Sequence, residues 1–136
     1  MLFRSELGYW GEVLTTAATA RGVVGLVIDG CVRDVSALAA HRFPVFSTGL
    51  ALPGATKQAS GSIGEHAVVG GVVVNAGDWV VGDADGVVVV PGAGFDDVVT
   101  AGRARADKEA GFFAALRSGA TTLELLGLDP SPIDRA

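Results

Sequence analysis

The chain has 136 residues, 49% of them hydrophobic and 18% charged, a composition that suits one globular domain with a sizeable core and excludes a disordered or fibrous protein. Ten basic residues stand against fifteen acidic ones, and the formal charge of −5, with the basic residues scattered, argues against direct binding of nucleic acid. The longest apolar run is far shorter than the roughly 20 residues of a membrane helix, and Cys31 is the only cysteine, so we expect a cytoplasmic protein without a membrane partner.

The chain opens on the pattern of a helix followed by a strand. Apolar residues recur at helical spacing between residues 7 and 21, and Gly22 is typical of the end of a helix. The β-branched run VVGLVI at residues 23–28 predicts a strand that is buried on both faces. No strand is expected before the helix, so we expect that the chain lacks an N-terminal part of a longer protein.

A second pair of elements is expected after a turn. Asp29-Gly30 has the chemistry of a turn, and Asp34 is placed to cap a helix that runs to His41. The segment PVFST, residues 44–48, predicts the next strand.

The second half of the chain changes from β-structure to helix. Residues 54–91 have no helical period, and their apolar runs alternate with turn residues, which predicts short paired strands. A long amphipathic helix is expected from Phe95 to Gly119, with acidic residues in its first turn and Arg117 in its last, and the tail at 128–136 is expected to be irregular. We therefore expect a single α/β domain over residues 1–136.

The first helix and strand together predict an anion and metal site. A helix from about Gly11 travels roughly 15 Å, and the strand returns by roughly 20 Å, so the start of the helix and the end of the strand lie at one level. The free N–H groups at residues 11–14 can bind a carboxylate or phosphate. Arg33 offers a fork for a carboxylate, and Asp34 and Glu12 are hard oxygen ligands that suit Mg²⁺ or Mn²⁺.

Plainer interpretations of the same residues stay open. Arg33 and Asp34 can be an ordinary loop pair, with Asp34 as a helix cap, and Glu12 can be an exposed helix residue. Composition and spacing alone do not decide between these interpretations and a binding site.

A family resemblance favours the site. Gly11-Glu12, twenty residues, and then Arg33-Asp34 lie within ARGVVGLVIDGCVRD and are followed by GDWVVGDADGVVVVP. This combination resembles the family of the regulator of ribonuclease activity A and the class II 4-hydroxy-4-methyl-2-oxoglutarate aldolases, from about Leu7 to Leu126.

The resemblance implies a swivelling-type α/β/β fold, assembled as a homotrimer or as a hexamer of two trimers. It also implies divalent-metal-dependent cleavage of a 4-hydroxy-2-oxo acid to pyruvate, with decarboxylation of oxaloacetate as a side activity. A small 2-oxo acid is the implied substrate, and Mg²⁺ or Mn²⁺ the implied cofactor.

The family's functional residues map onto positions of this chain. The backbone of Gly11, Glu12, Val13 and Leu14 would hold the carboxylate of the pyruvyl group. Arg33 would bind the substrate and stabilise the enolate, Asp34 would hold the metal largely through water, and Glu12 would anchor or activate a metal-bound water as acid or base.

The role of Glu109 stays open. Glu109 resembles an acidic residue that reaches the metal site of a neighbouring subunit, but it is equally well placed to pair with Arg105 four residues earlier on the long helix.

Two further functions stay open beside the aldolase. The regulator branch of the family predicts a protein that binds and inhibits a ribonuclease; members that only regulate are expected to lack an acid at the position of Glu12. The other alternative to the aldolase is an inactive fragment of a family member.

Overall fold

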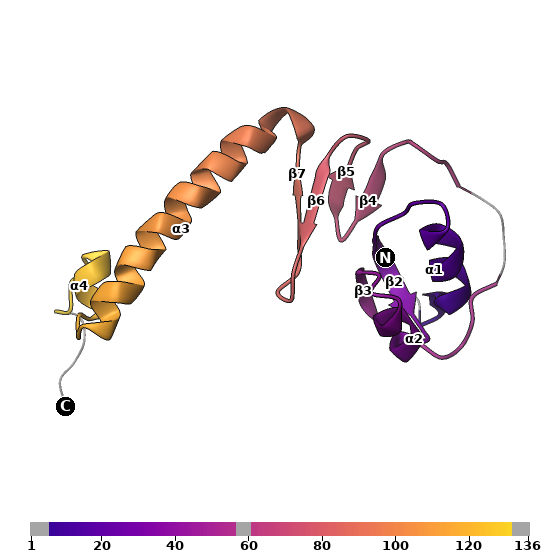
Figure 1. Cartoon of the computed structure of the whole chain (residues 1–136), viewed down its shortest axis with the longest axis horizontal. Coiled ribbons are helices and arrows are strands. Elements are labelled where there is room, and N and C mark those ends of the chain that lie inside the picture. The colour runs from indigo at the N-terminus through magenta and orange to yellow at the C-terminus, as the bar shows by residue number, and fades with distance from the viewer. Residues whose placement is uncertain (1–5, 57–60, 132–136) are drawn as a thin grey trace. The chain divides into compact units, whose positions relative to one another are not determined.

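The computed structural model describes residues 6–56 and 61–131. It divides into two compact units, Met1–Gly92 and Ala93–Ala136. Strands and helices are mixed, as predicted for an α/β fold (Figure 1). The single domain over residues 1–136 stays a prediction.

A parallel sheet forms the base of the first unit. Its strands are β1 (Gly8–Trp10), β2 (Leu26–Val32) and β3 (Val45–Leu50), in the order β1-β2-β3, so that β2 is central. Parallel neighbours need a crossover between them. The helices α1 (Glu12–Thr19) and α2 (Val35–Ala40) supply these crossovers, and each returns the chain to the same edge of the sheet.

The predicted helix over residues 7–21 is wrong at its start, because Gly8–Trp10 is a strand that pairs with the end of β2. The expectation that no strand precedes the first helix is therefore wrong as well. Gly8 donates its N–H to Pro53 O at 2.8 Å, and a Cβ at Gly8 would lie only 2.5 Å from Ala51 O. This close approach of two backbones selects an extended glycine over a helical turn.

The prediction of a turn at Asp29-Gly30 is wrong. Both residues lie inside β2. The Asp29 carboxylate instead accepts a hydrogen bond from Gly70 N–H at 3.2 Å. A partner 41 positions away satisfies the polar side chain, so the strand continues through a dipeptide that would otherwise favour a turn.

Two hairpins confirm the β-structure predicted for residues 54–91. β4 (Ala67–Val69) pairs antiparallel with β5 (Val72–Val74), and β6 (Trp79–Gly82) pairs antiparallel with β7 (Val87–Val90). Gly70 and Gly71 join the first pair with φ of 57° and 82°, the left-handed backbone that a two-residue hairpin turn requires.

The second unit confirms the long helix. After a short 3₁₀ turn, Gly92–Gly94, helix α3 runs over Phe95–Arg117 with Asp96 and Asp97 in its first turn and Arg117 in its last. Helix α4 (Thr122–Leu126) was not predicted. It begins with a capping box, in which Thr121 accepts from Glu124 N–H and the Glu124 carboxylate accepts from Thr121 N–H.

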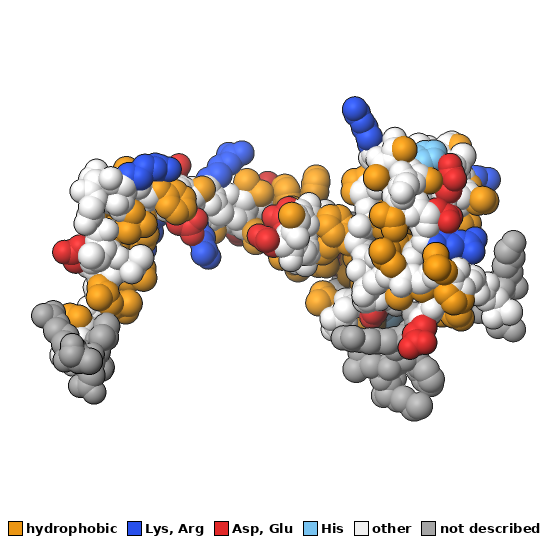
Figure 2. All heavy atoms as spheres, turned by 90° about the horizontal axis from the view of Figure 1, so that it is seen from below, with side chains coloured by type: hydrophobic (Ala, Val, Ile, Leu, Met, Phe, Trp, Pro, Cys, Tyr) orange, Lys and Arg blue, Asp and Glu red, His pale blue; other side chains and the backbone are white. Residues whose placement is uncertain are grey.

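The core of the first unit is formed by residues of the central strand, both of its helices and the loop after α2. Val32, Leu38 and Phe43 are buried, and Thr15 is fully enclosed. Hydrophobic side chains also lie at the surface of both units (Figure 2). No helix among residues 6–56 and 61–131 combines the length and the apolar character needed to cross a membrane.

Candidate active site

The N-terminus of α1 faces the carboxylate of Asp34. Glu12 donates its backbone N–H to Asp34 Oδ2 at 3.1 Å, and Gly11, at the N-cap position, has no side chain that could serve instead. A Cβ at Gly11 would overlap Asp34 Oδ2. Glycine at this position therefore allows the carboxylate of a distant residue to cap α1.

The prediction that Asp34 caps the helix that follows it is wrong. Asp34 precedes α2, but its side chain makes no capping hydrogen bond to that helix. Its backbone is left-handed, with φ of 59° and ψ of 39°, a conformation that aspartate tolerates better than most residues. Within the described residues, Asp34 Oδ1 has neither a hydrogen bond nor an ion pair.

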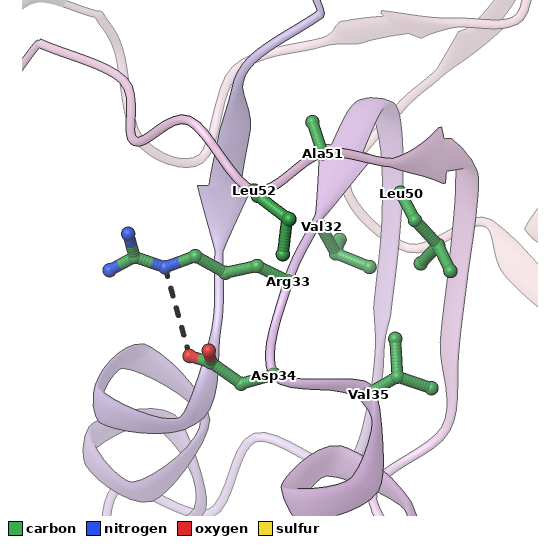
Figure 3. A pocket seen from close by; sticks show the side chains of 7 residues that line it. All are labelled: Val32, Arg33, Asp34, Val35, Leu50, Ala51 and Leu52. Carbon is green, nitrogen blue, oxygen red and sulfur yellow. Dashed lines mark ion pairs between the residues drawn. The ribbon is translucent and has the colours of Figure 1, made fainter.

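Arg33 is fixed by its backbone and exposed at its head. Its N–H donates to Trp10 O at 2.8 Å, which ties it to the end of β1. Arg33 Nε lies 3.7 Å from Asp34 Oδ2, and both side chains are 43% exposed, so this ion pair contributes at most about 1 kcal/mol. Figure 3 shows both charged side chains pointing away from Val35 and Leu50. The guanidinium is thus available to a ligand.

A pocket of about 350 Å³ lies beside this pair (Figure 3). Its size is within the range of small-molecule sites. Arg33 and Asp34 line the pocket together with five apolar residues: Val32, Val35, Leu50, Ala51 and Leu52.

Glu12 has a neighbour to which the sequence assigned no role. His41 Nε2 lies 3.7 Å from Glu12 Oε1, and the Glu12 side chain is 56% exposed. His41 stands at the C-terminus of α2, and α2 contacts α1. The pairing of these two helices could not be read from spacing along the chain.

Trp10 and Thr15 support the junction between β1 and α1. Trp10 donates its indole N–H to Thr15 Oγ1 at 2.7 Å, and its ring stacks on Phe43 with centroids 6.3 Å apart. The sequence placed Trp10 on a helix face and gave Thr15 no role. The sequence shows only a threonine five positions after a tryptophan, and the burial that makes their contact matter comes from the structure.

The backbone predicted to hold a carboxylate is divided in its surroundings. Gly11 is buried and the Glu12 N–H already donates to Asp34, whereas Val13 and Leu14 are exposed residues, at 79% and 46%. Within the described part of the chain, their N–H groups donate no hydrogen bond, as expected for the first turn of a helix. The structure thus brings Gly11, Glu12, Arg33 and Asp34 together; their roles stay predictions.

Glu109 lies in the second unit, on α3. Its Oε1 accepts from Arg105 Nε at 2.7 Å. The pair that the sequence offered as one alternative is therefore present, and a role of Glu109 toward a neighbouring subunit stays a prediction.

The donor set beside α1 fits a metal that keeps much of its water. Among residues 6–56 and 61–131, no three His, Cys, Asp or Glu side chains gather into a metal cage. Mg²⁺ is commonly bound by one or two carboxylates together with waters and substrate oxygens. The unpaired Oδ1 of Asp34 and the exposed carboxylate of Glu12 are suited to this kind of binding.

Comparison with known proteins identifies the family. The model of the family described as RraA-like, Aldolase/RraA, matches residues 3–89. The chain belongs to the RraA-like family. The resemblance seen in the sequence is thereby confirmed.

Relatives and solved structures of the RraA-like family agree with this assignment. A Halalkalibacterium halodurans protein provisionally named 4-hydroxy-4-methyl-2-oxoglutarate aldolase is 38% identical over 101 residues, which are 74% of this chain and 48% of that protein. A crystal structure of an uncharacterized Pseudomonas syringae pv. tomato protein superposes with a TM-score of 0.74 at 32% identity, over 88% of this chain and 60% of the other.

A second solved structure is that of a protein described as an RraA member. Streptomyces coelicolor RraAS2, described as an unusual member of the RNase ES inhibitor RraA family, gives a TM-score of 0.69 at 28% identity, over 86% of this chain and 60% of that chain. The present chain thus spans about half to three fifths of the length of these RraA-like proteins.

Proposed function

We propose that this RraA-like chain is a divalent-metal-dependent aldolase. It cleaves 4-hydroxy-2-oxo acids of the 4-hydroxy-4-methyl-2-oxoglutarate type to pyruvate, and it decarboxylates oxaloacetate as a side activity. The provisional aldolase name of the Halalkalibacterium halodurans relative supports the reaction class.

The observation that carries the proposal is the hydrogen bond between Glu12 N–H and Asp34 Oδ2 at 3.1 Å. It places the start of α1 against the end of β2. Arg33 and Asp34 line the small pocket. The first turn of α1, with Glu12 and its unpaired N–H groups, begins at the Asp34 carboxylate. Open α/β folds commonly bind ligands at this edge of the sheet.

The substrate carboxylate would lie between Arg33 and the first turn of α1. The N–H groups of Val13 and Leu14 point out of the helix N-terminus, where the dipole favours an anion. The Arg33 guanidinium can form a bidentate pair with a carboxylate or stabilise a developing enolate oxygen. These contacts would orient the 2-oxo acid before reaction.

Asp34 and Glu12 would hold the divalent cation, directly or through water. When bound, Mg²⁺ or Mn²⁺ supplies Lewis-acid polarisation of the keto group. In the cleavage, the 4-hydroxyl group gives up its proton and C4 becomes the carbonyl carbon of the second product. The electron pair of the broken C3–C4 bond forms the enolate of pyruvate, which then takes up a proton at C3. In this proposal Arg33 balances the charge of that enolate, and the Glu12 carboxylate takes up or returns a proton.

The assembly proposed for the active protein is a homotrimer or hexamer in the cytoplasm. In such an assembly Glu109 of a neighbouring subunit would add a carboxylate to the site. This role requires that Glu109 exchange its partner, because in the single chain it is held by Arg105.

Inhibition of a ribonuclease is a second candidate function. The similarity to Streptomyces coelicolor RraAS2 favours it. Glu12 favours the enzyme, because regulator-only members are expected to lack this acid. The two functions differ in whether Mn²⁺ or Mg²⁺ and a 2-oxo acid are needed.

A coupled assay for pyruvate tests the proposal. The purified chain is incubated with 4-hydroxy-4-methyl-2-oxoglutarate or oxaloacetate, with Mg²⁺, with Mn²⁺ or with a chelator. We expect pyruvate from both substrates and its loss with the chelator, with no effect of the protein on RNA decay in a parallel ribonuclease assay. Metal-independent background rates on both substrates would contradict the enzyme, and slowed RNA decay would then favour the regulator.

A further inference from the structure

Three glycines line the side chain of Arg33. A Cβ at Gly8 would lie 3.3 Å from Arg33 Cβ and 3.4 Å from its Cδ, and a Cβ at Gly11 would lie 3.0 Å from Cγ and 3.2 Å from Nε. A Cβ at Gly54 would lie 3.1 Å from Nη1. Residues without side chains thus border Arg33 from Cβ to Nη1, and all of these distances except the 3.4 Å to Cδ are shorter than an ordinary van der Waals contact.

Gly54 differs from the other two glycines in what a side chain would disturb. A Cβ at Gly8 would also press on Ala51 O, and one at Gly11 would overlap the Asp34 carboxylate. At Gly54, Arg33 Nη1 is the only atom of residues 6–56 and 61–131, apart from the adjacent residues, that a Cβ would meet within 4 Å, and the backbone is not left-handed. Within this described part of the chain, an alanine at position 54 is therefore compatible with the fold and meets only the guanidinium.

The backbone at Gly54 is held in place. Gly54 forms a parallel bridge with Gly8, and the preceding residue, Pro53, accepts the Gly8 N–H at 2.8 Å. Because this segment is tied to β1, a new methyl group would displace the Arg33 head rather than its own backbone. Arg33 cannot move as a whole, since its N–H is bonded to Trp10 O.

We propose that Gly54 is a positioning residue for Arg33. Its missing side chain leaves the space in which Nη1 lies, and so sets the direction of the guanidinium toward the substrate carboxylate. The inference rests on the proposed function in that Arg33 binds the 2-oxo acid. Gly54 itself touches neither substrate nor metal in this proposal.

A double-mutant cycle separates this role from a structural one. Gly54→Ala is expected to lower kcat/KM for pyruvate release by about tenfold to a hundredfold, because a misplaced guanidinium is a costly error in orientation. In an Arg33→Lys background, which has no Nη1, the same substitution is expected to change kcat/KM by less than about twofold. Gly49→Ala is the matched control, because among the described residues outside its own neighbours a Cβ there would meet only Cys31 Sγ, at 3.3 Å.

Three results would overturn the proposal. Gly54→Ala with wild-type kcat/KM would show that the guanidinium does not depend on this space. An equal loss in the Arg33→Lys background, or an equal loss in Gly49→Ala, would show that alanine acts through the backbone. Thermal unfolding of each variant accompanies the kinetics, and we expect Gly54→Ala to keep the wild-type midpoint to within about 2 °C.

Failure of the proposed function would be seen separately. If the wild type releases no pyruvate, the cycle is repeated by calorimetry with oxalate and Mg²⁺, since oxalate is a planar dianion like the pyruvate enolate. A weakening of oxalate binding in Gly54→Ala, absent from the Arg33→Lys background, would support the role of Gly54 without aldolase activity. If the wild type binds no oxalate, Arg33 receives no carboxylate here and both proposals fail.

Discussion

Asp34 caps a helix that begins 22 positions before it. Its Oδ2 accepts the N–H of Glu12 at 3.1 Å, and the left-handed backbone of Asp34 turns the carboxylate away from α2, the helix that it directly precedes. One carboxylate therefore joins the end of the central strand to the start of the first helix. Its second oxygen is left for a ligand.

Asp34→Asn should separate the charge of this residue from its geometry. Asparagine tolerates the left-handed backbone, and its amide oxygen can still accept the Glu12 N–H. We expect the fold to remain while the Mg²⁺ or Mn²⁺ concentration needed for half-maximal pyruvate release rises by about tenfold or more, because a neutral amide is a weaker ligand. Asp29→Asn, in the preceding strand β2, is the control, and unchanged metal dependence in Asp34→Asn would remove Asp34 from the metal site.

Arg33→Ala should abolish most of the activity without unfolding the chain. The side chain is 43% exposed and its ion pair with Asp34 spans 3.7 Å, so its loss has little effect on stability. We expect kcat/KM for pyruvate release to fall by about a hundredfold or more. Arg21→Ala removes another exposed arginine, which donates to Ala17 O, and should leave turnover unchanged; near-normal turnover in Arg33→Ala would disprove the assigned site.

Thr15→Val should destabilise the first unit. Thr15 is fully buried and its hydroxyl accepts the Trp10 indole N–H at 2.7 Å. Valine leaves that donor without its acceptor, which costs about 1 to 3 kcal/mol of the free energy of unfolding. Urea denaturation measures this, with Thr16→Val on the exposed side of the same helix as the control, expected within about 0.5 kcal/mol of wild type. Equal effects of the two substitutions would show that the Trp10 contact contributes nothing.

Glu109→Gln and Arg105→Gln should distinguish the two interpretations of Glu109. Both substitutions break the same exposed ion pair, Arg105 Nε to Glu109 Oε1 at 2.7 Å. If Glu109 serves the site of a neighbouring subunit, Glu109→Gln lowers the rate of pyruvate release and Arg105→Gln does not. We expect this difference in the oligomer. Equal rates in the two variants would show that Glu109 has no role in the site and only pairs with Arg105 on α3.

Asp78 should give the first unit a pH-dependent increment of stability. Its carboxylate accepts the Asn75 N–H at 2.8 Å, with a smaller effect from Gly92 N–H, and these bonds hold its pKa below the ordinary 3.8. The folded chain then binds this proton less readily than the unfolded chain. The stabilisation from Asp78 is fully present at pH values above its pKa in the unfolded chain. It is lost as the pH falls through the lower pKa that Asp78 has in the folded chain.

Asp78→Asn tests this increment. The variant should lose less stability than the wild type when the pH is lowered from 6 to 3, as measured by urea midpoints. Parallel pH profiles for the two proteins would exclude a contribution from Asp78.

Much of the secondary structure could be predicted from the sequence. The valine runs give β4 to β7, and the amphipathic period gives α3. The error at residues 7–21 arose because Gly8–Trp10 also fits a helical spacing, whereas pairing with β2 makes it a strand. A distant partner, Gly70, likewise overrides the local turn preference of Asp29.

The sequence by itself determined which chemical groups lie near one another. A helix start and a strand end separated by one crossover meet at the same level, so Glu12, Arg33 and Asp34 were expected together. Only the tertiary structure decided how they are held: that Asp34 caps α1 and not α2, and that Gly8, Gly11 and Gly54 border Arg33. The physical reason is that these contacts depend on the pairing of β1 with β2 and on the bridge between residues 8 and 54, which no local preference encodes.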